Sequence, residues 1–588
     1  MEKFLEALSQ ELMAAFEAEG YEAALGRVTV SNRPDLCEFQ CNGAMAGAKK
    51  YHKAPMQIAT DVAKHLTGSK TFSKFEVVMP GFMNMDVSPE FVCNYVTAMS
   101  EDGQFGVPKP ESRRKVVLDF GGPNVAKPLH VGHLRSAVIG ESIKRILRFC
   151  GHEVIGDIHL GDWGLPIGLV ISEIEVRKPD LVYFDENFTG EYPEESPVTV
   201  SELEEIYPFA SAKSKEDEEF KEKALKATFE LQAGRRGYRA LWHHIMAVSV
   251  ADLKKNYDRL RVEFDVWKGE SDVSDMIPPM IADMKKSGIA ELSEGAWVIN
   301  VKEETDSKEI PPCILLKSNG ATNYDSTDVA TVMERMQLYN PTDIVYVVDK
   351  RQDLHFVQCF RAVRKAGITD DSVNLQFIGF GTMNGPDGKP FKTREGGVMR
   401  LERLVNEIND AMYQKIKENR EISEEEAQKT AEIVGLAALK YGDLSNQATK
   451  DYVFDIDRFT SSEGETGPYI LYTIVRIKSI LNKFTEAGGS LEGLKLRPSC
   501  GVSEKNLNLQ LAQFSTMIQS ALEDLAPHKV CSYVYDLANA FNSFYHDNRI
   551  MTEEDKEKQK GWLALLLLTK KVMEQCIDLL GFTAPDRM

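Results

Sequence analysis

The stretch from Lys115 to Gly151 constrains the fold more than any other part of the chain. The apolar run KVVLDF is followed by a loop of Gly, Pro and Asn, and then by a helix-like run that ends at Gly151. Another apolar run, HEVIGDIHLG, and a further helical run come next. Because strands that alternate with helices are typical of βαβ units, this region predicts an α/β domain with a parallel sheet.

The rest of the chain divides by pattern. Residues 178 to about 262 are highly charged and helical by periodicity, which predicts an insertion on the outside of the sheet. We expect the strands GAWVINV, PPCILLKSNGATNY, DIVYVVD and LQFIGFGTM to form the second half of the same sheet. The predicted domains are an α+β domain over 1–110, the α/β domain over 111–398, a helical connector over 399–465 and an all-α helical bundle over 466–588.

Bulk properties exclude several classes of protein. At 588 residues the chain is too long for one hydrophobic core, so we expect a multidomain enzyme. Its net charge of -20 argues against nucleic-acid binding in general but leaves room for a basic face on one domain. Nine scattered cysteines indicate reduced thiols in the cytoplasm rather than a disulfide framework. The longest purely apolar run, LALLLL, is too short to cross a membrane, and the start does not look like a signal peptide.

The loop GGPNVAKPLHVGH precedes the first helix of the α/β domain. Such a loop opens at the carboxyl edge of a parallel sheet, and the unpaired N–H groups of the helix favour an anion. His130 and His133 are three apart and can point at one ligand, Lys127 adds a positive charge, and Gly132 lets a flat group approach the backbone. The pattern favours a phosphate cradle over zinc, because HxxxH is the commoner metal spacing and a third ligand is not obvious. A structural role stays open for any one of these residues alone.

The same loop resembles a known signature. HVGH is similar to the HIGH motif of class I aminoacyl-tRNA synthetases, and PNVAKPLHVGHLRS with HLGDWG resembles arginyl-tRNA synthetases of the bacterial type. Further matches in order are PGFMNMDVS, NYDSTDVAT, VVDKRQDLHFVQ, GKPFKTREGG, EGETGPYILYTIVRI and APDRM. The resemblance implies a Rossmann-type catalytic domain between an amino-terminal domain that contacts tRNA and an α-helical anticodon-binding domain.

The resemblance also implies a reaction and its partners. ATP activates L-arginine to arginyl-adenylate, and the arginyl group then passes to the 3′-terminal adenosine of tRNA(Arg), with release of pyrophosphate and AMP. Mg²⁺ is implied as the companion of ATP, without a dedicated protein metal site. We expect a cytoplasmic protein, monomeric and not bound to a membrane. Two alternatives remain open, a catalytically silent paralogue that binds tRNA and another HxGH nucleotidyltransferase.

Residues for ATP follow from the matched motifs. The family's second signature, KMSKS, is degenerate in PFKTR, where Thr393 stands in place of the usual second lysine. A lysine just before HIGH replaces it in many members, and Lys127 fits that substitution. The resemblance assigns catalysis to His130, His133, Lys127, Lys389 and Lys392. It assigns ATP binding to His130, Gly132, His133, Lys127, Lys392 and Thr393.

Arginine needs a pocket that prefers a planar guanidinium, which a carboxylate binds through paired hydrogen bonds. The resemblance makes Asp328 that carboxylate, although by pattern alone it would be a surface acid or a helix cap. Tyr324 lies four residues earlier, on the same helical face. The full implied set is Gly122, Pro123, Asn124, His133, Tyr324, Asp328 and Gln352. Asp162 and Trp163 are candidates for the edge of the pocket, although their pattern also fits a turn with a packed indole.

Contacts to tRNA are predicted at two places. In the anticodon module Tyr469 or Tyr472 is expected to stack on a base and Arg476 to meet a phosphate, although both tyrosines also fit a helix core. Arg235 and Arg236 lie in the clearest basic patch of the chain, which is equally compatible with a solvated helix face.

Overall fold

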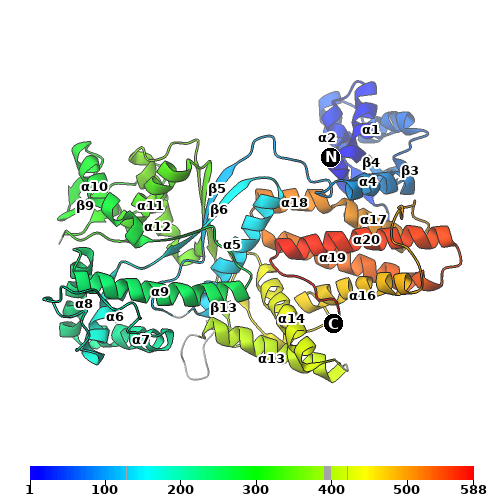
Figure 1. Cartoon of the computed structure of the whole chain (residues 1–588). Coiled ribbons are helices and arrows are strands. Elements are labelled where there is room, and N and C mark those ends of the chain that lie inside the picture. Colours follow the sequence, from blue (N-terminus) through cyan, green and yellow to red (C-terminus); the bar gives the residue numbers. More distant parts are fainter. Residues whose placement is uncertain (128, 319, 390–398, 420–421) are drawn as a thin grey trace. The chain divides into compact units, whose positions relative to one another are not determined.

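A computed structural model describes the chain apart from residues 128, 319, 390–398 and 420–421 (Figure 1). The residues form two compact units. The sheet unit consists of 112–419 and 442–460, and the terminal unit consists of 1–111, 420–441 and 461–588. The domain boundaries expected from the sequence stay predictions.

A parallel sheet forms the centre of the sheet unit. Its strand order is β12-β11-β5-β6-β7, and every neighbouring pair is parallel. The strands are β5 Lys115–Phe120, β6 Glu153–Leu160, β7 Val266–Gly269, β11 Asp343–Asp349 and β12 Asn374–Phe380. From β5 the chain first adds β6 and β7 on one side and later β11 and β12 on the other. This arrangement confirms the predicted α/β fold, and its order reverses at β5, where open parallel sheets bind ligands at the carboxyl edge.

Helices cover both faces of this sheet. On one face lies α5 (Val131–Phe149), where a Cβ on Gly140 would come within 2.3 Å of the Phe120 ring. On the other lies α11 (Tyr324–Tyr339) (Figure 1). Its Arg335 contacts Asp119 of β5 and Asp157 of β6. Side chains of successive strand residues point to opposite faces, so Asp119 and Phe120 necessarily meet different helices.

Two of the expected sheet strands lie elsewhere. The runs GAWVINV and PPCILLKSNGATNY contribute β9 (Ala296–Ile299) and β10 (Cys313–Leu316), which pair with β8 (Glu291–Ser293) in a separate antiparallel sheet of order β10-β9-β8. The prediction that they complete the central sheet is wrong. The turn at Glu294 and Gly295, both with positive φ, forces β8 and β9 into a hairpin, whereas parallel neighbours need a long crossover.

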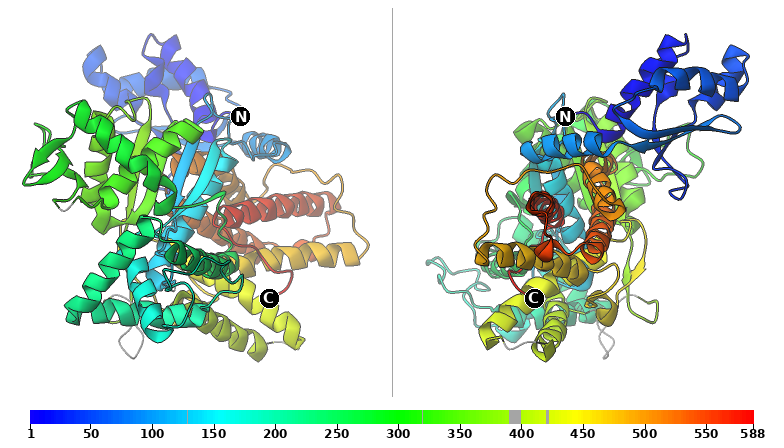
Figure 2. Two further views of the ribbon diagram at one scale, coloured as in Figure 1. Left: turned by 60° about the vertical axis from the view of Figure 1, so that its left-hand side comes forward. Right: turned by 90° about the vertical axis from the view of Figure 1, so that its right-hand side faces the viewer.

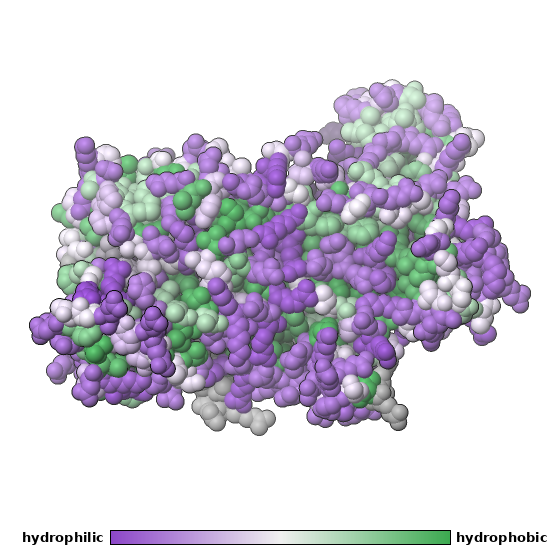
Figure 3. Space-filling view, in the orientation of Figure 1, coloured by the Kyte–Doolittle hydropathy of each residue, from purple (hydrophilic) through white to green (hydrophobic). Residues whose placement is uncertain are grey.

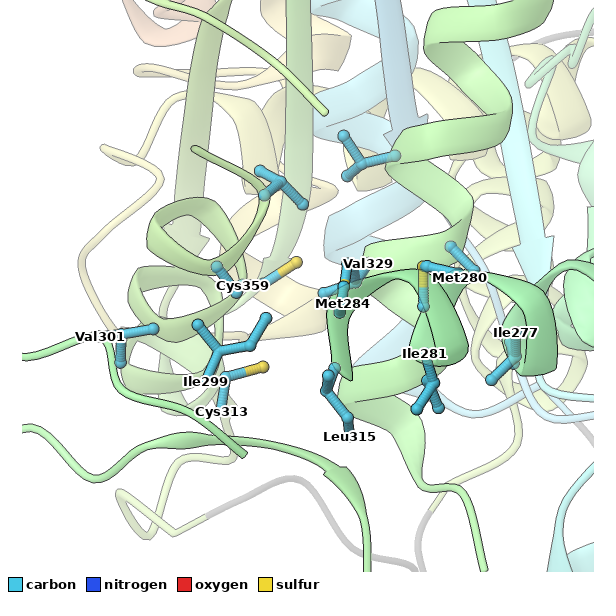
Figure 4. Packing of buried hydrophobic residues seen from close by; sticks show 14 of the residues in the cluster. Ile277, Met280, Ile281, Met284, Ile299, Val301, Cys313, Leu315, Val329 and Cys359 are labelled. Carbon is cyan, nitrogen blue, oxygen red and sulfur yellow. The ribbon is translucent and has the colours of Figure 1, made fainter. Parts of the chain in front are cut away.

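A hydrophobic core lies between this small sheet and the helices α10 (Ile277–Lys286), α11 and α12 (Asp353–Lys365). Figure 4 shows Met284 of α10, Val329 of α11 and Cys359 of α12 directed into it. All three side chains are at most 5% exposed. The core therefore fixes the first turns of α11 and α12 relative to each other.

The charged segment between β6 and β7 is helical, as expected. It contains α7 Val200–Glu216, α8 Glu218–Gln232 and α9 Arg236–Arg259, which follow α6 Leu165–Arg177. A small core of Leu169, Ala210, Phe220 and Ala224 joins α6, α7 and α8. The sheet unit also contains β13 Met383–Asn384, α13 Leu401–Asn419, β14 Tyr452–Val453 and α15 Ile456–Phe459, and the short 3₁₀ turns η3 Glu270–Met276 and η4 Lys350–Gln352.

The terminal unit has an α+β part and an all-α part, which confirms both predicted classes (Figure 2). An antiparallel sheet of order β1-β2-β4-β3 belongs to the first part. Its elements are α1 Phe4–Ala18, η1 Ala23–Gly26, β1 Thr29–Val30, β2 Phe39–Cys41, α2 Gly43–Tyr51, α3 Pro55–Ala63, η2 Lys64–Leu66, β3 Phe72–Val78, β4 Phe82–Val87 and α4 Pro89–Glu101. The second part contains α16 Gly467–Glu486, α17 Val502–Ala512, α18 Phe514–Glu523, α19 Pro527–Asp547, η5 Ile550–Thr552 and α20 Lys556–Leu579, and α14 Glu424–Leu444 has residues in both units.

Hydrophilic residues cover most of the face in Figure 3. Within the described part of the chain, every helix is too short or too polar to cross a bilayer. All nine cysteines are free thiols.

Candidate active site

The loop after β5 is fastened to the end of β6. Asn124 and Gly161 form an isolated parallel bridge, and the Gly161 amide donates to the Pro123 carbonyl at 3.1 Å. Gly122 must lack a side chain, because a Cβ there would lie 2.1 Å from the carbonyl oxygen of His159. The structure thus brings Gly122, Pro123 and Asn124 together at the carboxyl edge of the sheet.

The two histidines of HVGH form a compact pair at the start of α5. Their ring centroids are 3.9 Å apart. His130 is the N-cap residue, and its Nδ1 accepts from the Gly132 amide at 3.0 Å, while Nδ1 of His133 accepts from the His130 amide at 3.1 Å. A neutral imidazole with an accepting Nδ1 has its proton on Nε2. The pair therefore offers two Nε2–H donors.

Burial keeps both rings neutral. It lowers the pKa of His130 to about 4 and that of His133 to about 3, and the nearby Lys127 ammonium adds to both shifts. Burial lowers the pKa of Lys127, so its ammonium is a poorly solvated cation. Two neutral donors and one poorly solvated cation are suited to an anion such as a phosphate.

The position of the neighbouring His130 ring explains why residue 132 is a glycine. A Cβ at this position would lie 2.7 Å from Cε1 of His130, so the histidine ring itself requires the glycine. The expectation that Gly132 leaves room for adenine stays a prediction.

The structure describes the residues on either side of the second ATP signature, GKPFKTREGG, but not residues 390–398, which contain most of it. Lys392 and Thr393 lie outside the described residues. Lys389 is exposed and closes a turn, in which its carbonyl accepts from the Gly385 amide at 2.8 Å. On the other side Arg400 pairs with His130 in an isolated antiparallel bridge. The chain that leaves this signature is therefore hydrogen-bonded directly to the HVGH loop.

The expected arginine carboxylate lies on the first turns of α11. The chain passes from α11 into β11, so the start of this helix lies at the carboxyl edge of the sheet, as the site requires. Tyr324 and Asp328 share one face there, and Tyr324 is 62% exposed. Gln352 ends η4, directly beyond the carboxyl end of β11, and is also exposed. The same edge thus brings together the residues that the resemblance assigned to arginine.

Sequence reasoning missed His355. It lies on α12, and its Nε2 is 2.5 Å from Oδ2 of Asp328 while its Nδ1 is 2.9 Å from Oδ1 of Asp325. The only signal was a histidine inside the matched run VVDKRQDLHFVQ.

Sequence reasoning also missed Glu270, which follows β7 at the carboxyl edge. Burial, together with the charges of Asp162 and Asp328, raises the pKa of its carboxyl to about 7, while His159 acts in the opposite direction. A buried acid beside other acids stabilises a bound cation. Its sequence signal was weak, because β7 has only four residues of mixed polarity and was not recognised as a strand.

Asp162 and Trp163 have structural contacts. Asp162 accepts from the Ser271 amide and hydroxyl, and its carbonyl accepts from the Trp242 indole at 3.0 Å. Trp163 packs edge-to-face on Trp242, with ring centroids 5.3 Å apart. Among the described residues, groups of three or more His, Cys, Asp or Glu suited to a metal ion are absent.

The predicted tRNA contacts differ in accessibility. Tyr472 is 38% exposed, and the Arg476 guanidinium lies 4.8 Å from its ring centroid and 5.6 Å from that of Tyr545. Tyr469 instead donates from its hydroxyl to Oδ1 of Asn539 at 2.7 Å. The exposed tyrosine is the better stacking surface.

The basic patch on the insertion is largely engaged within its own unit. Arg235 pairs with Glu230 at 2.5 Å and donates to the Phe184 carbonyl at 3.0 Å. Arg236 donates to the Gly190 carbonyl at 2.9 Å. A role for either arginine in tRNA binding stays a prediction.

A parallel sheet with an HxGH loop at the point where its order reverses defines a nucleotide-binding α/β enzyme. Comparison with known proteins narrows this class. A family described as tRNA synthetases class I (R), catalytic domain, matches residues 95–456. The arginyl tRNA synthetase N terminal domain matches residues 2–87, and the DALR anticodon binding domain matches residues 470–588.

Full-length relatives agree with these matches. The chain is 59% identical to an arginine–tRNA ligase of Agathobacter rectalis and 52% identical to one of Alkaliphilus oremlandii, with all of each chain covered. Among solved structures, arginyl-tRNA synthetase from Plasmodium falciparum is similar, with a TM-score of 0.79 and 25% identity over the whole of both chains. The chain belongs to the arginyl-tRNA synthetase family. The resemblance is confirmed, and neither a silent paralogue nor another nucleotidyltransferase gains support.

Proposed function

We propose that this chain ligates L-arginine to tRNA(Arg) with the site at the carboxyl edge of the central sheet. One observation carries the proposal: two neutral histidines and a lysine lie at the same edge of the sheet as the carboxylates Asp328 and Glu270. The histidines and the lysine suit ATP, which enters with Mg²⁺ as a substrate complex, and the carboxylates suit a cationic amino acid. We expect a monomer that acts in the cytoplasm, in keeping with a role in translation.

In the first step the arginine carboxylate attacks the α-phosphorus of ATP, and pyrophosphate leaves. Negative charge grows on the phosphate oxygens, so the protein stabilises the transition state mainly by position and electrostatics. The Nε2–H groups of His130 and His133 donate to these oxygens, and the Lys127 ammonium neutralises charge. Because Lys127 is desolvated, its interaction with a phosphate is stronger than that of an exposed lysine.

Arginine recognition rests on the carboxylates. Asp328 and Glu270 accept from the guanidinium, a planar donor that carboxylates bind through charge-assisted hydrogen bonds. Tyr324 and Gln352 border the side chain. Asn124 and His133 hold the α-amino and carboxylate end, which brings the nucleophilic oxygen to the ATP site.

In the second step the arginyl group passes to the terminal ribose of tRNA and AMP leaves. The residues matched as an anticodon-binding domain supply the distant contact with tRNA. Within them the exposed Tyr472 ring lies beside the half-buried Arg476 guanidinium, which suits a stacked base next to a phosphate.

The test is ATP–pyrophosphate exchange with arginine, run with and without cognate tRNA. We expect arginine-dependent exchange. Exchange with a different amino acid, or none even with tRNA, would overturn the proposal. Asp328→Asn should raise the KM for arginine strongly and leave the KM for ATP nearly unchanged. Equal loss of both would show that the assignment of Asp328 is wrong.

A further inference from the structure

One imidazole joins the first two turns of α11. His355 lies on α12, and its two ring nitrogens bind carboxylates on either side, Asp325 at 2.9 Å and Asp328 at 2.5 Å. Each nitrogen faces an acceptor, so the arrangement is satisfied fully only when both nitrogens are protonated. The result is an imidazolium between two carboxylates, which we name the His355 bridge.

The bridge is rigid. Asp325 is 6% exposed, and its Oδ2 also accepts from Asn323 Nδ2 at 3.0 Å and from the Ile314 amide at 3.3 Å. The Tyr324 ring packs edge-to-face on the imidazole, with centroids 4.9 Å apart. Asp325, the carboxylate on one side of the bridge, is therefore held in a fixed position by its own hydrogen bonds.

The helices below the bridge are fixed as well. Val329 follows Asp328 directly, and Cys359 lies one turn after His355. Both side chains are fully buried in the core between α10, α11 and α12 (Figure 4). Movement of His355 relative to Asp328 would disturb this packing, and core packing resists small displacements.

We propose that His355 is a positioning residue for arginine recognition, which binds Oδ2 of Asp328 so that Oδ1 faces the guanidinium and which releases part of its proton when arginine binds. This inference rests on the proposed role of Asp328 as a guanidinium ligand. His355 acts through Asp328 and is not itself expected to touch the substrate.

The orientation matters because carboxylate recognition of a guanidinium is directional. A carboxylate that rotates freely attracts a compact ammonium about as well as a planar guanidinium, whereas one held in a fixed plane favours the fork of N–H donors. With Oδ2 occupied by His355, Asp328 offers Oδ1, and the neighbouring Glu270 supplies a second acceptor. The fixed rotamer therefore contributes to selection against lysine.

Charge coupling between arginine and His355 predicts that protons are released, not taken up, when arginine binds. Burial acts to lower the pKa of His355, but its hydrogen bonds to Asp325 and Asp328 raise that pKa to about 9. A guanidinium on Asp328 brings a second cation close to the imidazolium and lowers this pKa again. Binding of arginine then releases a fraction of a proton at a pH between the two values.

The titratable and charged groups that face the bridge come from several elements. On α11 the facing groups are Tyr324, Asp325 and Asp328, and the thiols of Cys313 on β10 and Cys359 on α12 lie buried nearby. On η4, Lys350 pairs with Asp451 at 2.6 Å and Arg351 with Asp349 at 2.7 Å. The adjacent strand β12 has no titratable side chain.

The test uses calorimetric titration of the full-length protein with L-arginine near pH 8, in two buffers of different ionisation enthalpy. This pH lies below the value of about 9 for His355 and above the value of about 7 for Glu270, so His355 supplies most of the released proton. We expect net proton release in the wild type and clearly less in His355→Gln. The α-amino group of arginine titrates equally in both experiments and cancels in the comparison.

A matched control is His152→Gln. His152 is also buried in the sheet unit, but it accepts from the Arg114 amide at the amino end of β6, away from the site. This variant should release as many protons as the wild type. Equal release in the wild type and His355→Gln would overturn the proposal. Should His355→Gln fail to fold, Asp325→Asn serves as a second variant, because it removes one partner of His355 and should also reduce the release.

A kinetic comparison separates this inference from the proposed function. His355→Gln should raise the KM for arginine at least about tenfold, with the KM for ATP and the circular dichroism spectrum unchanged. Its discrimination between arginine and lysine should fall as well. If Asp328→Asn impairs arginine binding and His355→Gln does not, only the positioning role fails. If Asp328→Asn leaves arginine binding intact, the proposed function of the pocket fails.

Discussion

The carboxylate of Asp162 accepts two hydrogen bonds from Ser271, one from its amide at 3.0 Å and one from its hydroxyl at 2.6 Å. Asp162 follows β6 and Ser271 follows β7, so the pair ties together the ends of two neighbouring strands. Glu270 directly precedes Ser271 in the chain. Asp162 of the HLGDWG motif therefore helps to position Glu270, which we propose as one carboxylate of the arginine pocket, without itself needing to touch arginine.

The first prediction concerns this link. Ser271→Ala removes the shorter of the two hydrogen bonds and leaves the amide bond in place. Since one such bond contributes about 1 kcal/mol, we expect the KM for arginine to rise about fivefold and the KM for ATP to stay the same. Steady-state aminoacylation at varied arginine and varied ATP measures both constants.

Ser287→Ala is the control for this variant. Its hydroxyl donates to the Met284 carbonyl at the end of α10, so the KM for arginine should not change. An unchanged KM in Ser271→Ala would mean that Asp162 does not position Glu270 through this hydroxyl.

The second prediction concerns the charge of Glu270. Its pKa of about 7 leaves the carboxyl largely neutral below that pH and ionised above it. A guanidinium binds the ionised form, so the KM for arginine should fall as the pH rises from about 6 to about 8. Glu270→Gln, which cannot ionise, should give a higher KM and a flatter profile over this range.

The KM for ATP, measured across the same range, is the internal reference. The pKa values of His130 and His133, about 4 and about 3, lie well below this range, so these two residues do not contribute to the profile. A wild-type profile for arginine that is flat from pH 6 to pH 8 would contradict the assignment of Glu270.

Local periodicity predicted the central fold because β5, α5 and β6 follow one another along the chain. The loop from Gly122 to His133 was found for the same reason, since its residues are neighbours in sequence. The hairpin of β8 and β9 was misassigned because an apolar run alone does not reveal which sheet a strand joins. The turn at Glu294 and Gly295 was the available signal.

The residues that the sequence did not reveal lie on separate elements. Glu270 follows β7 and His355 lies on α12. Only in the folded chain does His355 contact Asp328 of α11, and only there does the charge of Asp328 raise the pKa of Glu270. Pairings across such distances have no periodic signature. Asp328 itself was found only through the resemblance, because an acid near the start of a helix is ordinarily a cap or a surface residue.

The third prediction distinguishes between the lysines. Lys127 is partly buried beside His130, and burial lowers its pKa, whereas Lys389 is exposed at a turn. A desolvated cation contributes more to transition-state stabilisation than an exposed one. Lys127→Met should therefore lower kcat for ATP–pyrophosphate exchange by roughly two orders of magnitude, and Lys389→Met by much less. A larger loss of kcat in Lys389→Met than in Lys127→Met would show that the second signature, and not Lys127, supplies the positive charge of the usual KMSKS lysine.

The last prediction concerns the buried ions beneath the pocket. Arg335 is 1% exposed, and its Nη2 contacts Asp157 at 2.7 Å and Asp119 at 2.5 Å. It lies two turns after Asp328 on the same helix, so it fastens α11 to the central sheet. Arg335→Met leaves two carboxylates buried without their cation, and loss of one partner of a buried pair typically lowers the free energy of unfolding by about 3–5 kcal/mol.

Urea unfolding, monitored by hydrogen exchange in β5 and β6, measures this loss of stability. Adding Asp157→Asn to Arg335→Met removes one of the stranded charges and should restore part of the stability, so the double variant should unfold at higher urea than Arg335→Met alone. Arg351→Met provides the reference, because its pair with Asp349 is on the surface and such pairs contribute about 0–1 kcal/mol. Equal stability of Arg335→Met and Arg351→Met would show that the buried ions do not hold α11 to the sheet.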